Sequence, residues 1–398
     1  MPCFFVGDPS GNRTHVYAVR GRRLSRLTIG PYLLDFGIIS HTQKKCKPFF
    51  AFFSKNFYSC IFAPRFAFPH GFFFTFAIYK AGFLVYHYYI YPIKLLFGGS
   101  LSAMKGSPYM IVKRNSPVFG PGGNSESFYR EGFKSTKQAP AWVKARGLDA
   151  YEYQGGNGIT AGNASLTEVG KAAADAGISM SLHAPYFISL SGVDPEKRLG
   201  SLNYIRRSVE AAKLLGAHTV VIHAGSAAKI SREEAMALAR DTLSHVADEF
   251  GDCGVALGIE TMGKINQLGT LDEVIELCRT APCFVPVVDF GHLNARSLGG
   301  LFVTPDDYRR VFDEIGSRLS SDHAKYLHCH FSKIEYTKAG EKRHLTFSDT
   351  VFGPSFEPLA EVIAADGLCP SIICESAGTM AEDAAEMKHL LALAVERK

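Results

Sequence analysis

Residues 218–260 read HTVVIHAGSAAKISREEAMALARDTLSHVADEFGDCGVALGIE and hold one complete alternation of strand and helix patterns. Both ends of this stretch, 218–224 and 255–260, are short, rich in β-branched residues and almost unbroken in hydrophobicity, which is typical of parallel strands covered on both faces. Between them, Ser231 is a favourable N-cap for a helix with acidic residues in its first turn. The apolar residues that follow recur at helical spacing: Ala235, Leu238, Leu243 and Val246. The stretch therefore predicts a β-α-β unit.

The same alternation extends along the chain in both directions. Further strand-like runs occupy 110–113, 149–153, 179–184, 285–290, 325–331 and 370–375. Helical patterns lie between them, at 203–215, after the predicted capping box of Thr270 and Glu273, and at 381–395. Eight strand–helix units within about 290 residues predict an α/β fold, a (β/α)₈ TIM barrel with right-handed connections.

Residues 1–103 have a different composition from the rest of the chain. They contain 17 of the 30 Phe and 12 basic residues but only two acids, so their net charge is +10, whereas residues 104–398 carry −5. We therefore divide the chain into a Phe-rich basic extension, 1–103, and a barrel domain, 104–398. The extension is expected to be spurious or unstructured, and dispensable for the activity of the barrel.

Two observations bear on how the extension arises. Residues 7–30 resemble a string found in reading frames called across structural-RNA genes, which favours a true start at Met104 or Met110. The alternatives are a small domain, or a membrane anchor at 71–93, where the apolar run is interrupted by Lys80 and His87. No membrane segment is expected in the barrel.

Overall composition is that of a globular protein, with 46% hydrophobic and 20% charged residues, which excludes collagen, coiled coil and wholesale disorder. The nine Cys form no CxxC pair and lie mostly in apolar runs. Buried free thiols in a reducing compartment are the simplest interpretation. We expect a cytoplasmic monomer without a protein partner.

Metal-ligand residue types end six consecutive strand-like runs. From the third run to the eighth they are His183, His223, Glu260, Asp289, His330 and Glu375. Two more imidazoles lie nearby in sequence: His292 follows Asp289 by three residues, and His344 lies after the seventh run. The carboxyl ends of barrel strands converge on one face. Carboxylates gathered there repel one another unless cations neutralise them, and this mixture of imidazole and carboxylate suits Zn²⁺ or Mn²⁺.

Each residue taken singly has an ordinary structural explanation. A His at a strand end is often a hydrogen-bonded structural residue, and Glu260, Glu375 and Asp289 could each cap a turn or a helix. His328 precedes His330 by two positions on the same strand face, so either could be the inward ligand. We favour His330 because it is nearer the end of the strand. Six such residues in register favour a metal site.

The motifs LHAPYFISL, VVIHAGS, GIET, VDFGH, LHCHFSK, KRH and CES, spread over residues 110–398, resemble the endonuclease IV family. This family belongs to the wider barrel superfamily that includes xylose isomerase. Its members are apurinic/apyrimidinic endonucleases with three metal ions, usually zinc. The resemblance implies one ion on His183, His223 and Glu260. Glu260 would bridge to a second ion, which Asp289, His330 and Glu375 also hold. A third ion would lie on His292 and His344.

One position departs from the family pattern, because Lys342 stands where the family usually has an aspartate two residues before the last histidine. Glu341 or Glu335 could replace that oxygen ligand; otherwise the third site would be weak or empty, and Lys342→Asp would raise its occupancy. Lys342 and Arg343 could also bind a phosphate. Asn124 and Asn157, in the glycine-rich segments FGPGGNS and EYQGGNG, are weaker substrate-binding candidates.

The resemblance implies cleavage of double-stranded DNA on the 5′ side of abasic sites, in base excision repair. Clustered divalent ions suit such hydrolysis because they activate water and neutralise the phosphate. Glu260 and Glu375 would act on the attacking water, and the abasic nucleotide would be flipped out of the duplex. The main alternative is a sugar isomerase or epimerase with a single Mn²⁺ or Mg²⁺. A barrel that only binds nucleic acid is a third, although a net charge of −5 is not that of a strongly basic DNA binder.

Overall fold

The computed structural model describes residues 111–398 in full and, before them, only the backbone of seven short strands. These strands pair in antiparallel fashion: β1 (Phe4–Gly7) with β2 (Arg13–Val16), β3 (Arg26–Ile29) with β4 (Tyr32–Ile38), β4 with β5 (Phe62–Arg65), and β6 (Ala77–Tyr79) with β7 (Gly82–Leu84). The chain divides into two compact units, Met1–Ser102 and Ala103–Lys398. The two possible start residues, Met104 and Met110, and most of 71–93 lie outside the described residues.

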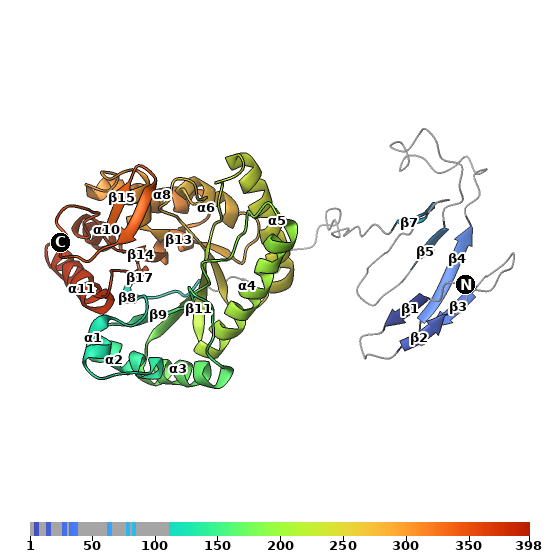
Figure 1. Ribbon diagram of the computed structural model, residues 1–398, viewed down its shortest axis with the longest axis horizontal. Coiled ribbons are helices and arrows are strands. Elements are labelled where there is room, and N and C mark those ends of the chain that lie inside the picture. Colours follow the sequence, from blue (N-terminus) through green and yellow to red (C-terminus); the bar gives the residue numbers. More distant parts are fainter. Residues whose placement is uncertain are drawn as a thin grey trace, which may run out of the picture. The chain divides into compact units, whose positions relative to one another are not determined.

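Eight parallel strands form the barrel of the second unit (Figure 1). In chain order they are β8 (Val118–Pro121), β9 (Ala150–Gln154), β10 (Ser179–His183), β11 (Ala217–His223), β12 (Ala256–Glu260), β13 (Phe284–Asp289), β14 (His328–Phe331) and β17 (Ser371–Cys374). The strands pair in the order β8-β17-β14-β13-β12-β11-β10-β9, so each lies beside its neighbours in sequence. The predicted (β/α)₈ barrel is confirmed.

The barrel closes where β8 meets β9. The backbone N–H of Asp149 donates to the carbonyl of Phe119 at 2.8 Å, and the N–H of Gly123 donates to the carbonyl of Glu152 at 3.0 Å. Gly120 is required at this seam, because a Cβ at that position would lie 1.7 Å from the backbone oxygen of Ala150. Glu152 lies at this seam, and its side chain is fully buried inside the barrel.

Helices surround the strands on the outside (Figure 1). They are α1 (Glu126–Arg130), α2 (Ala139–Ala145), α3 (Asn163–Ala176), α4 (Pro195–Leu215), α5 (Arg232–Phe250), α6 (Leu271–Cys278), α7 (Phe290–Arg296), α8 (Pro305–Arg318), α9 (Ser321–Lys325), α10 (Glu357–Asp366) and α11 (Met380–Glu396), with a 3₁₀ turn at Thr136–Gln138. An antiparallel hairpin of β15 (Ile334–Thr337) and β16 (Gly340–His344) follows β14.

Two of the predicted helix starts are confirmed in detail. Ser231 Oγ accepts the N–H of Glu234, and Thr270 forms a capping box with Glu273. The predicted helix 203–215 is longer than its apolar stripe indicated. It begins eight residues earlier, where Asp194 accepts two backbone N–H groups and Pro195 occupies the first helical position.

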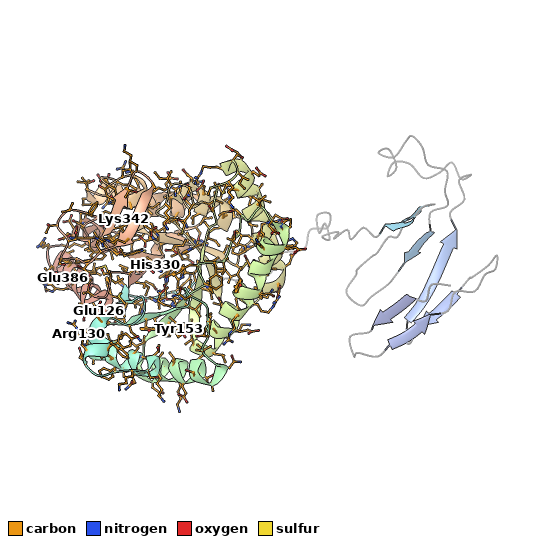
Figure 2. All side chains as sticks on the ribbon, in the orientation of Figure 1. Glu126, Arg130, Tyr153, His330, Lys342 and Glu386 are labelled. Atoms are coloured by element: carbon orange, nitrogen blue, oxygen red, sulfur yellow. The ribbon has the colours of Figure 1, made fainter. Side chains whose placement is uncertain are left out.

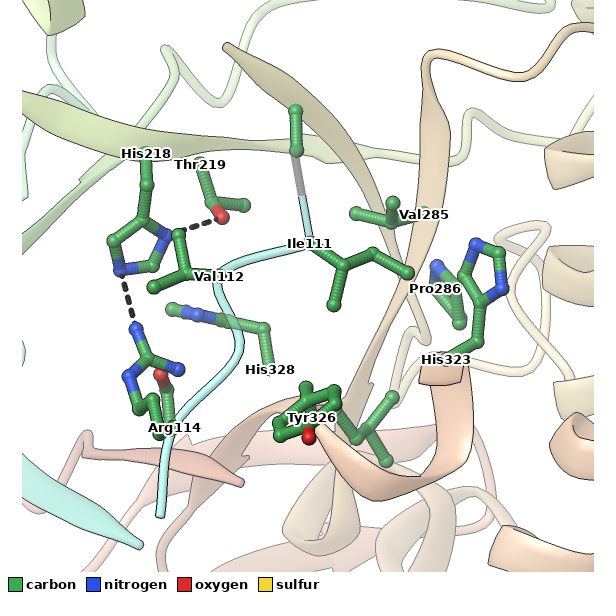
Figure 3. Close-up of a pocket in the computed structure, with 13 residues that line it drawn as sticks. Ile111, Val112, Arg114, His218, Thr219, Val285, Pro286, His323, Tyr326 and His328 are labelled. Carbon is green, nitrogen blue, oxygen red and sulfur yellow. Dashed lines mark hydrogen bonds between the residues drawn. The ribbon is translucent and has the colours of Figure 1, made fainter. Parts of the chain in front are cut away.

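The predicted first strand, 110–113, is wrong. Residues 111–117 form no strand, and the first barrel strand is Val118–Pro121. The glycine and prolines after residue 116 are typical of a loop, but the close approach at the barrel seam requires a glycine there. Ile111 and Val112 instead line a pocket at the amino-terminal ends of the strands (Figure 3).

The hydrophobic core lies between the strands and the helices, with residues such as Phe119, Leu257 and Ile372 fully or almost fully buried. All six cysteines of residues 111–398 are free thiols, and all but Cys253 are buried. Among the described residues, no helix combines the length and the apolar character that crossing a membrane requires.

Candidate metal centre

The carboxylate of Glu260, at the end of β12, is the centre of the site. Its Oε2 lies 3.3 Å from Nε2 of His183 and 3.4 Å from Nε2 of His223, and its Oε1 lies 3.0 Å from Nδ1 of His330. The Glu260 side chain is fully buried. Burial alone would raise the pKa of this carboxyl, but His330 and the hydrogen bonds from the surrounding histidines hold the pKa well below its usual value.

The first group of potential ligands consists of His183, His223 and Glu260, whose donor atoms lie within 4.8 Å of one another. Nδ1 of His183 is 2.8 Å from the carbonyl of Ala184, to which it donates its proton. This bond leaves the lone pair of Nε2 facing Glu260, as a metal ligand requires. The ring of Tyr186, half exposed, stacks on His223 with 5.3 Å between the ring centroids.

The second group consists of Glu260, Asp289, His330 and Glu375, from four neighbouring strands. Asp289 ends β13, where its Oδ1 accepts the backbone N–H of His292 at 2.7 Å. Its Oδ2 is buried without a hydrogen-bond partner. An unpaired buried carboxylate oxygen is costly. Because it faces three further donors, these residues fit a divalent cation.

The third group consists of His292, Glu341 and His344. Nδ1 of His292 donates to the carbonyl of Thr261 at 2.9 Å, and its Nε2 lies 3.5 Å from Oε2 of Glu341. His344, at the end of β16, places Nδ1 2.8 Å from the hydroxyl of Ser332. The β15–β16 hairpin therefore supplies both an imidazole and a carboxylate to this group.

The hairpin places the two candidate oxygen ligands, Glu341 and Glu335, in different surroundings. Glu341 faces His292, whereas Glu335 accepts hydrogen bonds from Lys342 at 2.5 Å and from Arg343 at 2.6 Å. The side chains of Lys342 and Arg343 are 53% and 67% exposed, so both cations point away from the third group. Figure 2 shows His330 toward the middle of the barrel and Lys342 on the hairpin.

The two asparagine candidates lie outside the three groups. Asn124 is engaged by its neighbours, because its Oδ1 accepts from the hydroxyl of Tyr151 at 2.8 Å and its Nδ2 donates to the hydroxyl of Tyr129 at 3.2 Å. Asn157 is exposed in the turn after β9.

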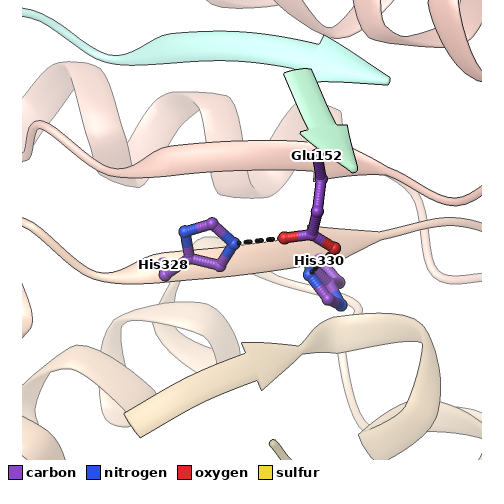
Figure 4. A group of neighbouring side chains, drawn as sticks. All are labelled: Glu152, His328 and His330. Carbon is purple, nitrogen blue, oxygen red and sulfur yellow. Dashed lines mark hydrogen bonds and ion pairs between the residues drawn. The ribbon is translucent and has the colours of Figure 1, made fainter. Parts of the chain in front are cut away.

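Sequence reasoning missed a buried cluster beside the centre: Glu152 with His328 and His330 (Figure 4). Glu152 is fully buried on β9, and His328 lies two residues before His330 on β14. The signal was present, because a lone acid between Tyr151 and Tyr153 in a buried strand needs a partner. Both histidines thus point into the barrel, and only His330 reaches Glu260.

The described mouth of the barrel defines a class of protein, a (β/α)₈ barrel with clustered imidazole and carboxylate groups at the carboxyl ends of its strands. Residues 140–393 match the family described as xylose isomerase-like TIM barrel. The chain belongs to this family.

The curated relatives match parts of the barrel at modest identity. The uncharacterized protein MJ0133 of Methanocaldococcus jannaschii is 31% identical over 206 residues, 50% of this chain and 72% of that protein. A "Probable endonuclease 4" of Acholeplasma laidlawii is 29% identical over 174 residues, 41% of this chain and only 55% of its own length. Among solved structures, a D-tagatose 3-epimerase-like protein superposes with a TM-score of 0.54 at 18% identity, over 70% of this chain and 97% of that one. This last likeness concerns the fold alone.

Proposed function

We propose that the protein is a metal-dependent phosphodiester hydrolase that cleaves double-stranded DNA on the 5′ side of abasic sites. The observation that carries this proposal is the presence of three adjacent ligand groups, of which two share Glu260. A sugar isomerase with one ion needs only the second group. The additional histidines, His183, His223, His292 and His344, would then have no ligand role. The relatives named "Probable endonuclease 4" support the same choice.

The three groups fit zinc, because they combine imidazole nitrogen with carboxylate oxygen. His183, His223 and Glu260 would hold one ion, and Glu260, Asp289, His330 and Glu375 a second. His292, Glu341 and His344 would hold a third. Bound there, the ions would polarise the phosphodiester and lower the pKa of water.

The protein's own residues supply the remaining chemistry. Burial raises the pKa of the Glu375 carboxyl, with contributions from the nearby Glu260 and Asp289, although His330 and His344 oppose the shift. Glu375 lies toward the opening of the site, with its side chain 14% exposed. A carboxylate at this position would lie beside the attacking water and could accept its proton. The buried Glu260 orients that water and holds the two groups together.

Double-stranded DNA with an abasic site would be the partner of this centre, and a cytoplasmic monomer would meet it directly. Lys113 and Arg114 are poor candidates for phosphate contacts at the site. Lys113 pairs with Asp322, and Arg114 bonds Ser179 at the amino-terminal end of β10, opposite the metal centre.

A second candidate function is a sugar isomerase or epimerase, and one observation favours it. The group of Glu260, Asp289, His330 and Glu375 offers four ligand atoms by itself, enough for a single Mn²⁺. Glu260 and Glu375 could then transfer protons on a bound sugar.

Metal analysis of the purified protein, combined with an assay on a duplex containing one abasic site, separates the two functions. Cleavage on the 5′ side of the lesion with two to three zinc ions per chain is the expected result. One manganese per chain, without cleavage but with turnover of a ketose, would support the isomerase instead.

A further inference from the structure

The imidazole of His330 lies between two buried carboxylates. Nδ1 is 3.0 Å from Oε1 of Glu260, on the side of the metal centre, and Nε2 is 3.1 Å from Oε1 of Glu152, on β9 (Figure 4). His330 and both carboxylates are fully buried. Nδ1 makes a hydrogen bond with Glu260, whereas the Nε2 contact with Glu152 has the length of a hydrogen bond but not its angle, and Nε2 has no other partner. When Nδ1 serves a metal instead, Glu152 is the acceptor that lies beside a proton on Nε2.

The other oxygen of Glu152 is held in place by its neighbours. Oε2 accepts from Ser181 Oγ at 2.9 Å and from His328 Nε2 at 3.0 Å. Ser181 lies directly opposite Glu152 in the register of β9 and β10, so both side chains enter the barrel at the same level. Within residues 111–398, no lysine or arginine forms an ion pair with Glu152. Its partners are two imidazoles, the Ser181 hydroxyl and the amide of Gln154, which donates to Oε1 at 3.4 Å.

Two roles are open to such a cluster, and the chemistry of imidazole separates them. Glu152, His328 and His330 lie close enough to hold an ion of their own. His330 would then bind ions through both nitrogens, which requires the loss of both ring protons. A neutral imidazole has one N–H and one lone pair. A carboxylate that accepts the N–H leaves the lone pair on the opposite nitrogen for a metal.

We infer that Glu152 is a positioning residue for the metal centre, which fixes His330 with its proton on Nε2 and its lone pair on Nδ1, directed at Glu260 and Glu375. Ser181 and His328 hold the second oxygen of Glu152, and His328 also contacts the ring of His330 edge-on. This inference rests on the metal centre of the proposed function. On this inference, Glu152 raises the affinity of the centre for metal although it is not itself a ligand of the three groups.

Zinc titration of the chelator-stripped full chain tests the inference through Glu152→Gln, which keeps the shape of the side chain but weakens the acceptor. One zinc-binding step should lose roughly 10–100-fold in affinity, the usual effect of removing such a partner. The matched control is Asp241→Asn, which removes the carboxylate partner of the buried Arg198 between α4 and α5. The control should lower the unfolding temperature and leave every zinc step unchanged.

A second measurement needs no variant of Glu152. In the zinc-loaded wild-type protein with ¹⁵N-labelled histidine, the His330 ring should carry its proton on Nε2. Zinc steps that are equal in Glu152→Gln and in the wild type, or a His330 proton on Nδ1, would overturn the inference and leave the proposed function standing. A wild-type protein that binds no zinc would overturn both.

Discussion

The two ends of the barrel are built from the same strands but carry charged groups of opposite sign. At the carboxyl ends, Glu260, Asp289 and Glu375 gather with imidazoles, and within the described chain none of these acids pairs with a lysine or arginine. At the amino ends, the pocket has no acidic residue in its described lining, and Arg114 is its one guanidinium (Figure 3).

At the amino end the guanidinium of Arg114 is hydrogen-bonded within the protein, whereas His328 Nδ1 and Ser371 Oγ of the pocket lining have no partner. Arg114 donates to Nε2 of His218 at 2.9 Å and to Ser179 at 3.1 Å, while Nδ1 of His218 bonds Thr219 at 2.8 Å. Burial and the neighbouring Arg114 hold the pKa of His218 well below its usual value, so the neutral ring can accept the bond from Arg114. The comparison teaches that a hollow does not mark the site. The pocket is at one end, whereas the buried acidic oxygen without a hydrogen-bond partner among the described residues, Oδ2 of Asp289, is at the other.

The largest expected effect is at the carboxyl end, in Glu260→Gln. The amide cannot supply the charge that two ligand groups share, so cleavage and metal content should both fall steeply. Initial rates on the abasic duplex, with circular dichroism to verify folding, measure the effect. Activity above about a tenth of wild type, a barrier change under roughly 1.4 kcal/mol, would contradict the assigned role.

A smaller effect at the same end distinguishes two neighbouring residues of the hairpin. Glu341→Gln should weaken the weakest zinc step by about tenfold, within the range seen when a partner of a metal site is lost. Lys342→Asp should change zinc binding little, because Lys342 is directed at Glu335 and Glu341 already faces His292. Calorimetric zinc titration compares the variants. If Lys342→Asp tightened the weakest step, our assignment of Glu341 to the third group would be wrong.

At the amino end, substitution should affect stability and not catalysis. Arg114→Met removes two hydrogen bonds and leaves the half-buried His218 with one partner fewer, which should cost about 1–3 kcal/mol of unfolding free energy. Urea unfolding measures this loss, and the cleavage assay serves as the control. A drop in turnover at unchanged fold would show that the two ends are functionally coupled.

The smallest effect concerns Asp307, which forms the capping box of α8 with the N-cap residue Thr304 and belongs to neither end. Backbone and side-chain hydrogen bonds from Thr304, with a further bond from Val303, lower the pKa of Asp307 from 3.8 to about 2. A depressed carboxyl pKa stabilises the fold above its unfolded value, and this contribution is lost as the pH falls through the folded one. The stability difference between wild type and Asp307→Asn should therefore shrink between pH 3.8 and about 2. A difference that stays constant over this range would exclude the linkage.

The sequence predicted the barrel and the residues at its strand ends for one reason. Hydrophobic runs and helical periods are local patterns, and the carboxyl ends of parallel barrel strands must converge. His183, His223, Glu260, Asp289, His330 and Glu375 could thus be grouped without coordinates. Their roles as ligands remain predictions.

What the sequence by itself determined is therefore the fold and the gathering of these residues at the carboxyl ends of its strands. Only the tertiary structure shows where the first strand lies, that Glu341 faces His292, and that Glu152 is buried against His330. Each depends on a contact between residues far apart in the chain: the approach of Gly120 to Ala150, the fold of the hairpin over His292, and the crossing of Glu152 to His330. Local patterns cannot specify such contacts, because distances across the interior are fixed only when the barrel closes.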